Sequence, residues 1–168
     1  DCIDFCRRCQ ACYAELGDPA GQAKALKQMV IAQATGFDQG LFGAEVLPQV
    51  AASCRQALDL LQEAPDTEEN RWLAGTLWNE IGALHRAQRR WDEAAEAYQR
   101  YLAINEALGH HLGMGVAYGN LGELLAKLSL ERWPGAEAAF RQSLEIARAN
   151  HDPAQEMDSL ANLAHLHQ

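Results

Sequence analysis

The sequence predicts an all-α fold, a solenoid of about eight helices arranged in antiparallel pairs. Three observations lead to this prediction. The chain is rich in Ala, Leu, Glu, Gln and Arg, which all favour helices. The strict alternation of apolar and polar residues that marks strands is absent. The second half of the chain also repeats itself at an interval of about 40 residues, a length typical of stacked helix pairs.

Composition narrows the classes of function. The 168 residues suit one domain or a short repeat array, and 48% hydrophobic with 22% charged residues indicates a globular chain. The net charge of −9 disfavours nucleic acid as a partner, because phosphate binding needs a basic surface. The sequence contains no run of about 18 apolar residues, so it predicts no membrane span. Five cysteines, an odd number, favour a reducing compartment, and we expect a cytoplasmic protein.

Helix ends are marked by chemistry along the whole chain. Asp18 followed by Pro19, and Asp152 followed by Pro153, predict N-caps with proline in the first turn. Asp92 is expected to be the N-cap of a third helix, with acidic residues rather than proline in its first turn. The predicted helices cover residues 1–16, 20–35, 47–63, 71–88, 92–108, 113–129, 134–149 and 154–167.

The repeats share a small motif in each helix of a pair. The first helix carries an aliphatic residue followed by Gly or Ala, at Ile81-Gly82, Leu121-Gly122 and Leu163-Ala164. The second helix carries Ala followed four residues later by an aromatic residue, at Ala94 and Tyr98 and again at Ala136 and Phe140. The first motif begins at residues 81, 121 and 163, so the interval is 40 and then 42 residues.

This pattern resembles the tetratricopeptide repeat, W-x2-L-G-x2-Y followed by A-x3-F. The best copy consists of Trp78, Ile81, Gly82, His85, Ala94 and Tyr98. The longer interval is similar to a subclass found in scaffold proteins and bacterial regulators. The resemblance implies a right-handed solenoid in which small residues let neighbouring helices approach and the aromatic residue fills the gap. It covers residues 71–168 most strongly.

Extending the register backwards divides the chain into one array. We expect a lone second helix at 1–16, a degenerate repeat at 20–63 with an insertion at 35–47, repeats at 71–108 and 113–150, and a lone first helix at 154–168. The array is therefore interpreted as a piece of a larger scaffold or regulatory protein. The insertion carries the apolar residues Phe37, Leu41 and Phe42. It is expected either to form a short extra helix on the solenoid or to contact a partner or ligand.

Four thiols lie in the first helix, at Cys2, Cys6, Cys9 and Cys12. At about 100° per residue they share an arc of roughly 120°. One helix offers a metal two thiolates at i and i+4 but not a tetrahedral set. Because Cys6 aligns with Tyr98 in the repeat register, we expect these thiols, like Cys54, to be buried core residues. A metal or redox site at this helix is the alternative.

Catalytic motifs are missing from the sequence. We found no nucleophile–base pairing, no Gly-rich phosphate loop after a strand and no H-E-x-x-H motif. We therefore expect no enzymatic activity, no cofactor and no metal.

The resemblance places function in the concave groove, which the first helices of the pairs line. We expect this groove to bind a peptide or protein segment, because Asn side chains offer both a donor and an acceptor to a peptide backbone. The expected groove residues are Lys24, Lys27, Asn79, Arg86, Asn120, Glu123, Lys127, Asn162 and His165.

Two further interpretations stay open. The chain is alternatively an effector-sensing segment of a bacterial signalling or transcription protein, with an apolar pocket near residues 36–47. Self-association through exposed apolar faces at the solenoid ends is also expected.

Overall fold

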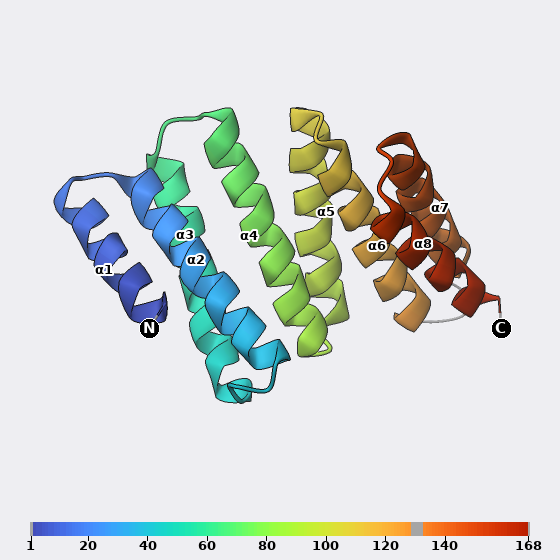
Figure 1. Cartoon of the computed structure of the whole chain (residues 1–168), viewed down its shortest axis with the longest axis horizontal. Helices are drawn as coiled ribbons and strands as arrows, with labels where there is room; N and C mark the ends of the chain where they lie inside the picture. The colour runs from blue at the N-terminus through green and yellow to red at the C-terminus, as the bar shows by residue number, and fades with distance from the viewer. Residues whose placement is uncertain (1, 129–132, 168) are drawn as a thin grey trace. The chain divides into compact units, whose positions relative to one another are not determined.

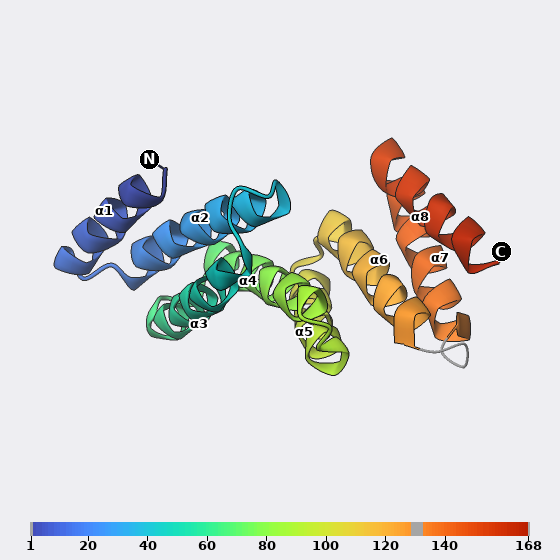
Figure 2. The ribbon, with the colours of Figure 1, turned by 90° about the horizontal axis from the view of Figure 1, so that it is seen from below.

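The computed structural model describes residues 2–128 and 133–167, without the side chains of Phe37, Asp38 and Trp133. The described residues form an all-α solenoid-type fold of eight helices and one short 3-10 helix (Figures 1 and 2). These elements are α1 (Cys2–Glu15), α2 (Pro19–Asp38), η1 (Ala44–Val46), α3 (Leu47–Glu63), α4 (Glu68–Ala87), α5 (Trp91–Leu108), α6 (His111–Leu128), α7 (Trp133–Ala149) and α8 (Pro153–Leu166). Their order and bounds confirm the eight predicted helices.

Two of the three predicted aspartate caps are present. Asp18 Oδ1 accepts a hydrogen bond from the Gly21 backbone N–H at 2.9 Å. Asp152 Oδ1 accepts two, from the N–H groups of Ala154 and Gln155. The prediction for Asp92 is wrong, because Arg90 is the N-cap of α5 and makes no side-chain cap bond. Asp92 lies inside the first turn, where a carboxylate also interacts favourably with the helix dipole.

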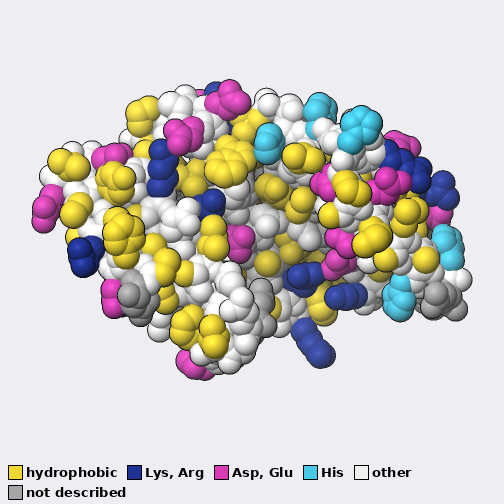
Figure 3. Space-filling model, viewed as in Figure 1, with side chains coloured by type: hydrophobic (Ala, Val, Ile, Leu, Met, Phe, Trp, Pro, Cys, Tyr) yellow, Lys and Arg dark blue, Asp and Glu magenta, His cyan; other side chains and the backbone are white. Residues whose placement is uncertain are grey.

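The chain divides into two compact units, residues 1–84 and 85–168, with the boundary inside α4. In the first unit α2 contacts both α1 and α3 (Figure 2). In the second unit α6 contacts α5, α7 and α8, and α7 also contacts α8. On the face drawn in Figure 3, acidic, basic and hydrophobic side chains are interspersed.

The first unit has a core of small and branched side chains. Val30, which stands where the repeat has Gly, is completely buried, and so are Val50, Cys54 and Ala57. The expectation that Cys54 is a core residue is therefore confirmed.

The residues of the predicted insertion at 35–47 lie in the end of α2, in η1, in the turn between them and at the start of α3. The helix α2 continues to Asp38, and Gly40 then adopts a left-handed conformation with φ of 70°. The N–H of Leu41 donates to the carbonyl of Gly36 at 2.7 Å, which is the closing bond of a Schellman motif. The expected short extra helix is present as the three residues of η1, a 3-10 helix. Leu41 is exposed, and the ring of Phe42 lies over Gly36.

The second unit contains the same core cluster twice. Each cluster combines an alanine and an aromatic residue from one helix with a leucine from another, in the sets Ala94, Tyr98, Leu124 and Ala136, Phe140, Leu166. Corresponding members are 42 residues apart. A Cβ at Gly122 would lie 2.6 Å from the Phe140 ring, so the glycine provides the close approach that the motif predicts.

Candidate functional site

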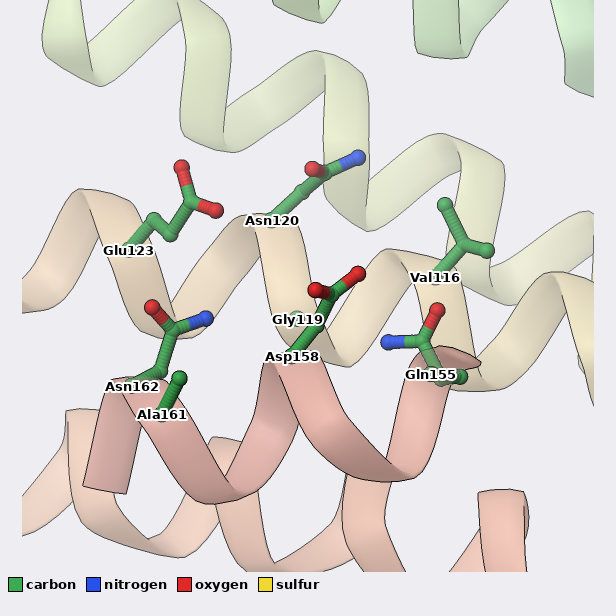
Figure 4. Close-up of a pocket in the computed structure, with 8 residues that line it drawn as sticks. All are labelled: Val116, Gly119, Asn120, Glu123, Gln155, Asp158, Ala161 and Asn162. Atoms are coloured by element: carbon green, nitrogen blue, oxygen red, sulfur yellow. The ribbon is translucent and has the colours of Figure 1, made fainter. Parts of the chain in front are cut away.

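A cavity of about 420 Å³ lies between α6 and α8 in the second unit (Figure 4). Its described lining consists of Val116, Gly119, Asn120 and Glu123 from α6 and Gln155, Asp158, Ala161 and Asn162 from α8. The polar members are three amides and two carboxylates. We call this cavity the α6–α8 pocket.

The repeat places the two asparagines in the α6–α8 pocket. Asn120 and Asn162 are 42 residues apart, the interval that also relates the two core clusters. Each stands directly before the leucine of the aliphatic-small pair in its helix. Their side chains consequently reach the same cavity from neighbouring first helices (Figure 4).

A buried hydrogen-bond network holds α8 beside α6 and α7. Ser143 Oγ donates to the carbonyl of Gly115 at 2.9 Å. The same oxygen accepts hydrogen bonds from Gln155 Nε2 at 2.9 Å and from the hydroxyl of Ser159 at 3.0 Å. Ser143 and Ser159 are buried, and all three hydrogen-bonding positions of the Ser143 hydroxyl are used. Gln155 therefore reaches the pocket from a fixed position.

The two carboxylates of the pocket have different partners. Glu123 Oε2 forms an ion pair with Arg86 Nη1 at 2.5 Å, and both side chains are about one-third exposed. Asp158 is exposed and has no ion-pair or hydrogen-bond partner among the described residues. Figure 4 shows its carboxylate extending from α8 toward α6. One carboxylate is thus neutralised within the chain and the other is open.

A smaller cavity of about 220 Å³ continues from the first. It shares Glu123 and Asn162 with the α6–α8 pocket and adds Lys127 and His165. The two cavities together form a strip along α6 and α8. It is polar and acidic at the first cavity, while the second combines Lys127 and His165 with the apolar Ala126, Phe140 and Leu166. We call this strip the α6–α8 groove.

The structure brings several predicted groove residues together. Asn120, Glu123, Lys127, Asn162 and His165 line the α6–α8 groove, and Arg86 reaches it through Glu123. Their role in binding stays a prediction.

Three predicted groove residues lie in the first unit. Lys24 Nζ forms an ion pair with Glu69 at 2.8 Å, and the hydrogen bond that Lys24 donates to this carboxylate raises the Lys24 pKa. Lys27 Nζ lies 5.0 Å from the centre of the Trp72 ring, a cation–π contact. Asn79 is half-buried on α4.

Sequence reasoning missed two polar members of the pocket, Gln155 and Asp158. Both share a face of α8 with Asn162, at offsets of seven and four residues. Helical periodicity from Asn162 would have identified them, because residues three, four and seven positions apart face the same way. The sequence predicts this helix, but the expected groove residues on it include only those next to Leu163.

The N-terminal thiols differ from the prediction. Only Cys6 is buried; Cys9 is half-buried, and Cys2 and Cys12 are exposed. The reason is that α1 packs against α2 with one face, which is too narrow to cover an arc of roughly 120°. Burial and the neighbouring thiols of Cys2 and Cys9 raise the Cys6 pKa. Within residues 2–128 and 133–167, no three His, Cys, Asp or Glu residues lie close enough together to hold a metal ion.

Other cavities have a different character. One of about 360 Å³ between α5, α6 and α7 is mainly apolar, with Gln99 and Gln142 at its edge. Another of about 380 Å³ lies between the end of α3 and the start of α4. Residues 36–47, where the sensor interpretation places an apolar pocket, line neither of these cavities nor the α6–α8 groove.

These features define a helical-repeat protein with a polar groove between the first helices of two repeats. Residues 72–149 match the family model described as tetratricopeptide repeat, so this part of the chain consists of tetratricopeptide repeats. This fold is in general a non-catalytic module for protein interaction. Among the described helices, none is both long and apolar enough to cross a membrane.

A solved structure extends the likeness beyond the matched repeats. The crystal structure of BtubC (BKLC) from P. vanneervenii superimposes with a TM-score of 0.69 at 19% sequence identity. The alignment covers 98% of this chain and 61% of that one, so this chain spans less than two thirds of its length. The fold is therefore shared over nearly the whole chain. No curated protein sequence matches.

Proposed function

We propose that this chain binds an extended peptide segment of a partner protein in the α6–α8 groove, in a scaffold or regulatory role and without catalysis. The observation that carries the proposal is that Asn120 and Asn162, from two successive repeats, line the same cavity. A reducing, cytoplasmic setting suits the five free thiols.

The chemistry of the groove suits a peptide backbone. An extended segment presents N–H and C=O groups at regular intervals, and each asparagine side chain offers both a donor and an acceptor. The Gln155 amide lies close over Gly119, where a Cβ would be 3.3 Å from Gln155 Nε2, and Ala161 projects only a methyl group into the cavity. The lining is polar and open to solvent on one side, which favours a segment of chain over a small apolar effector.

Peptide selection followed by variant binding tests this function. Dodecamers selected from a random display library on the full chain should bind at least about tenfold more weakly to the Asn120→Ala, Asn162→Ala double variant. Each lost hydrogen-bonding side chain is worth about 1 kcal/mol, and 1.4 kcal/mol is a factor of ten.

A matched control removes two amides from a different cavity of the same unit. Gln99 and Gln142 are both exposed at the edge of the apolar cavity, and replacing both by alanine should leave the affinity unchanged. If the selected peptides bind the asparagine double variant as tightly as the unaltered chain, the groove is not the binding site.

A further inference from the structure

We infer that the α6–α8 pocket is a subsite for a guanidinium, the side chain of an arginine in the bound segment. This inference rests on the proposed peptide-binding function and adds the class of segment that the groove accepts. It follows from the charges that line the cavity, from a guanidinium that the chain already places against it, and from the shape of its walls.

The charge in the pocket is unbalanced. Its eight described lining residues include two carboxylates, Glu123 and Asp158, and no Lys, Arg or His. Three amides complete the polar lining, and their carbonyl oxygens are acceptors. An incoming anionic side chain would meet like charge, whereas a cation would meet an open carboxylate surrounded by acceptors.

A guanidinium already contacts this lining. Arg86, from the end of α4, holds Nη1 2.5 Å from Glu123 Oε2. The pair shows that the α6 wall of the pocket accepts a guanidinium at hydrogen-bond distance. Asp158 on the opposite wall has no such partner among the described residues, so it is the carboxylate open to a cation from outside.

The walls favour arginine over lysine. A planar guanidinium carries five N–H donors and can pair with both oxygens of Asp158 while a further N–H group is available for the amide oxygen of Asn162. Ala161 projects only a methyl group into the space between the two helices, and Val116 offers an apolar surface to the alkyl stem. An ammonium has three donors and cannot form the bidentate pair.

The test uses two probes of nearly the same shape, one with a charged guanidinium and one with a neutral urea in which a carbonyl oxygen replaces one donor nitrogen. The ¹⁵N-labelled full chain is titrated with acetyl-Gly-Ala-Arg-Ala-Gly-amide and with the same peptide carrying citrulline in place of arginine. The arginine peptide should shift backbone amide signals of residues 116–123 and 155–162. The citrulline peptide is nearly isosteric but neutral. The affinity derived from its titration should be at least about fivefold lower, as expected for one lost charge-assisted hydrogen bond.

Variants separate the roles of the two carboxylates. Asp158→Asn should lower the affinity for the arginine peptide at least about fivefold. Asp59→Asn, which removes an exposed charge on α3, should leave this affinity unchanged. Arg86→Gln should strengthen binding by up to about fivefold, because it frees Glu123 from a partly exposed ion pair.

Three results would overturn the inference: equal shifts with the citrulline peptide, unchanged affinity in Asp158→Asn, or weaker binding in Arg86→Gln. If the arginine preference fails while library-selected peptides still depend on Asn120 and Asn162, the groove binds peptides without reading this charge. If selected peptides ignore the asparagines but the arginine peptide shifts the pocket, the proposed function fails instead.

Discussion

At Gly122 the missing side chain lets the ring of Phe140 lie against α6, inside the cluster that Ala136 and Leu166 complete. A Cβ there would lie 2.6–3.0 Å from three carbons of a ring that is almost fully buried. Neither the ring nor the helix can move freely, because the surrounding core is closely packed. The residue therefore determines how closely α6 and α7 pack.

The Gly122→Ala variant should lower the free energy of unfolding by about 1–3 kcal/mol, as overpacking in a core does, although alanine is the better helix former. Urea denaturation followed by circular dichroism measures the change. Gly135→Ala is the control, because a Cβ there would make ordinary contact with Leu125 at 3.4 Å. If both variants gain stability, the ring does not require the glycine.

Cys54 is fully buried, and desolvation raises the pKa of its thiol from 9.0 to about 12. Between these values the unfolded chain loses the thiol proton while the folded chain retains it. Stability that is fully present below pH 9 is therefore lost as the pH rises toward 12.

Between pH 8 and pH 10 this linkage should lower the free energy of unfolding by about 1.4 kcal/mol. The measurement compares urea denaturation of the unaltered chain and of Cys54→Ala at both pH values. Other titrating groups cancel in the difference between the two proteins. At pH 8 the variant should be less stable than the unaltered chain, because removing the thiol leaves a small cavity in the core. At pH 10 the difference in free energy of unfolding between the two proteins should be smaller. A gap that stays constant would mean that the buried thiol ionises normally.

At the scale of the helix, α8 depends on its first turn. Asp152 accepts hydrogen bonds from two backbone N–H groups, and Gln155 in the same turn joins the buried Ser143 network. The cap therefore fixes both the start of α8 and the wall of the α6–α8 pocket that carries Asp158.

Replacing Asp152 by alanine should cost about 1 kcal/mol of stability, whereas asparagine, which caps equally well, should cost little. Thermal unfolding of both variants followed by circular dichroism gives the comparison. Equal losses in the two variants would indicate that the charge of Asp152, rather than its capping oxygen, stabilises the helix.

The insertion shows where element-level prediction from sequence ends. Its apolar residues correctly indicated that it is more than a solvated loop, since Val46 and Leu47 are buried. The division between an extended α2 and the short η1 depends on the left-handed turn at Gly40 and on the Phe42 ring over Gly36. Helical periodicity predicts neither the left-handed turn nor the position of the ring.

At the scale of the whole molecule, the repeat made most of the fold predictable. Small and aromatic residues recurring at a fixed interval define which helices pair, and the structure has the same core cluster twice in the second unit. The same interval identified Asn120 and Asn162 as neighbours in space. The carboxylate of Asp158 in the pocket could not be predicted from the interval, because the repeat constrains packing positions more tightly than groove positions. A binding role for the asparagines stays a prediction.

The spacing of Asn120 and Asn162 also bears on how such a groove can evolve. Because the two side chains occupy the same place in successive repeats, duplicating one repeat of 42 residues would add a third amide in line with them. The stretch of ligand that is read could then lengthen by one step while every earlier contact is retained. In this architecture, ligand length and ligand chemistry can change independently, the first by duplication and the second by single substitutions such as those at position 158.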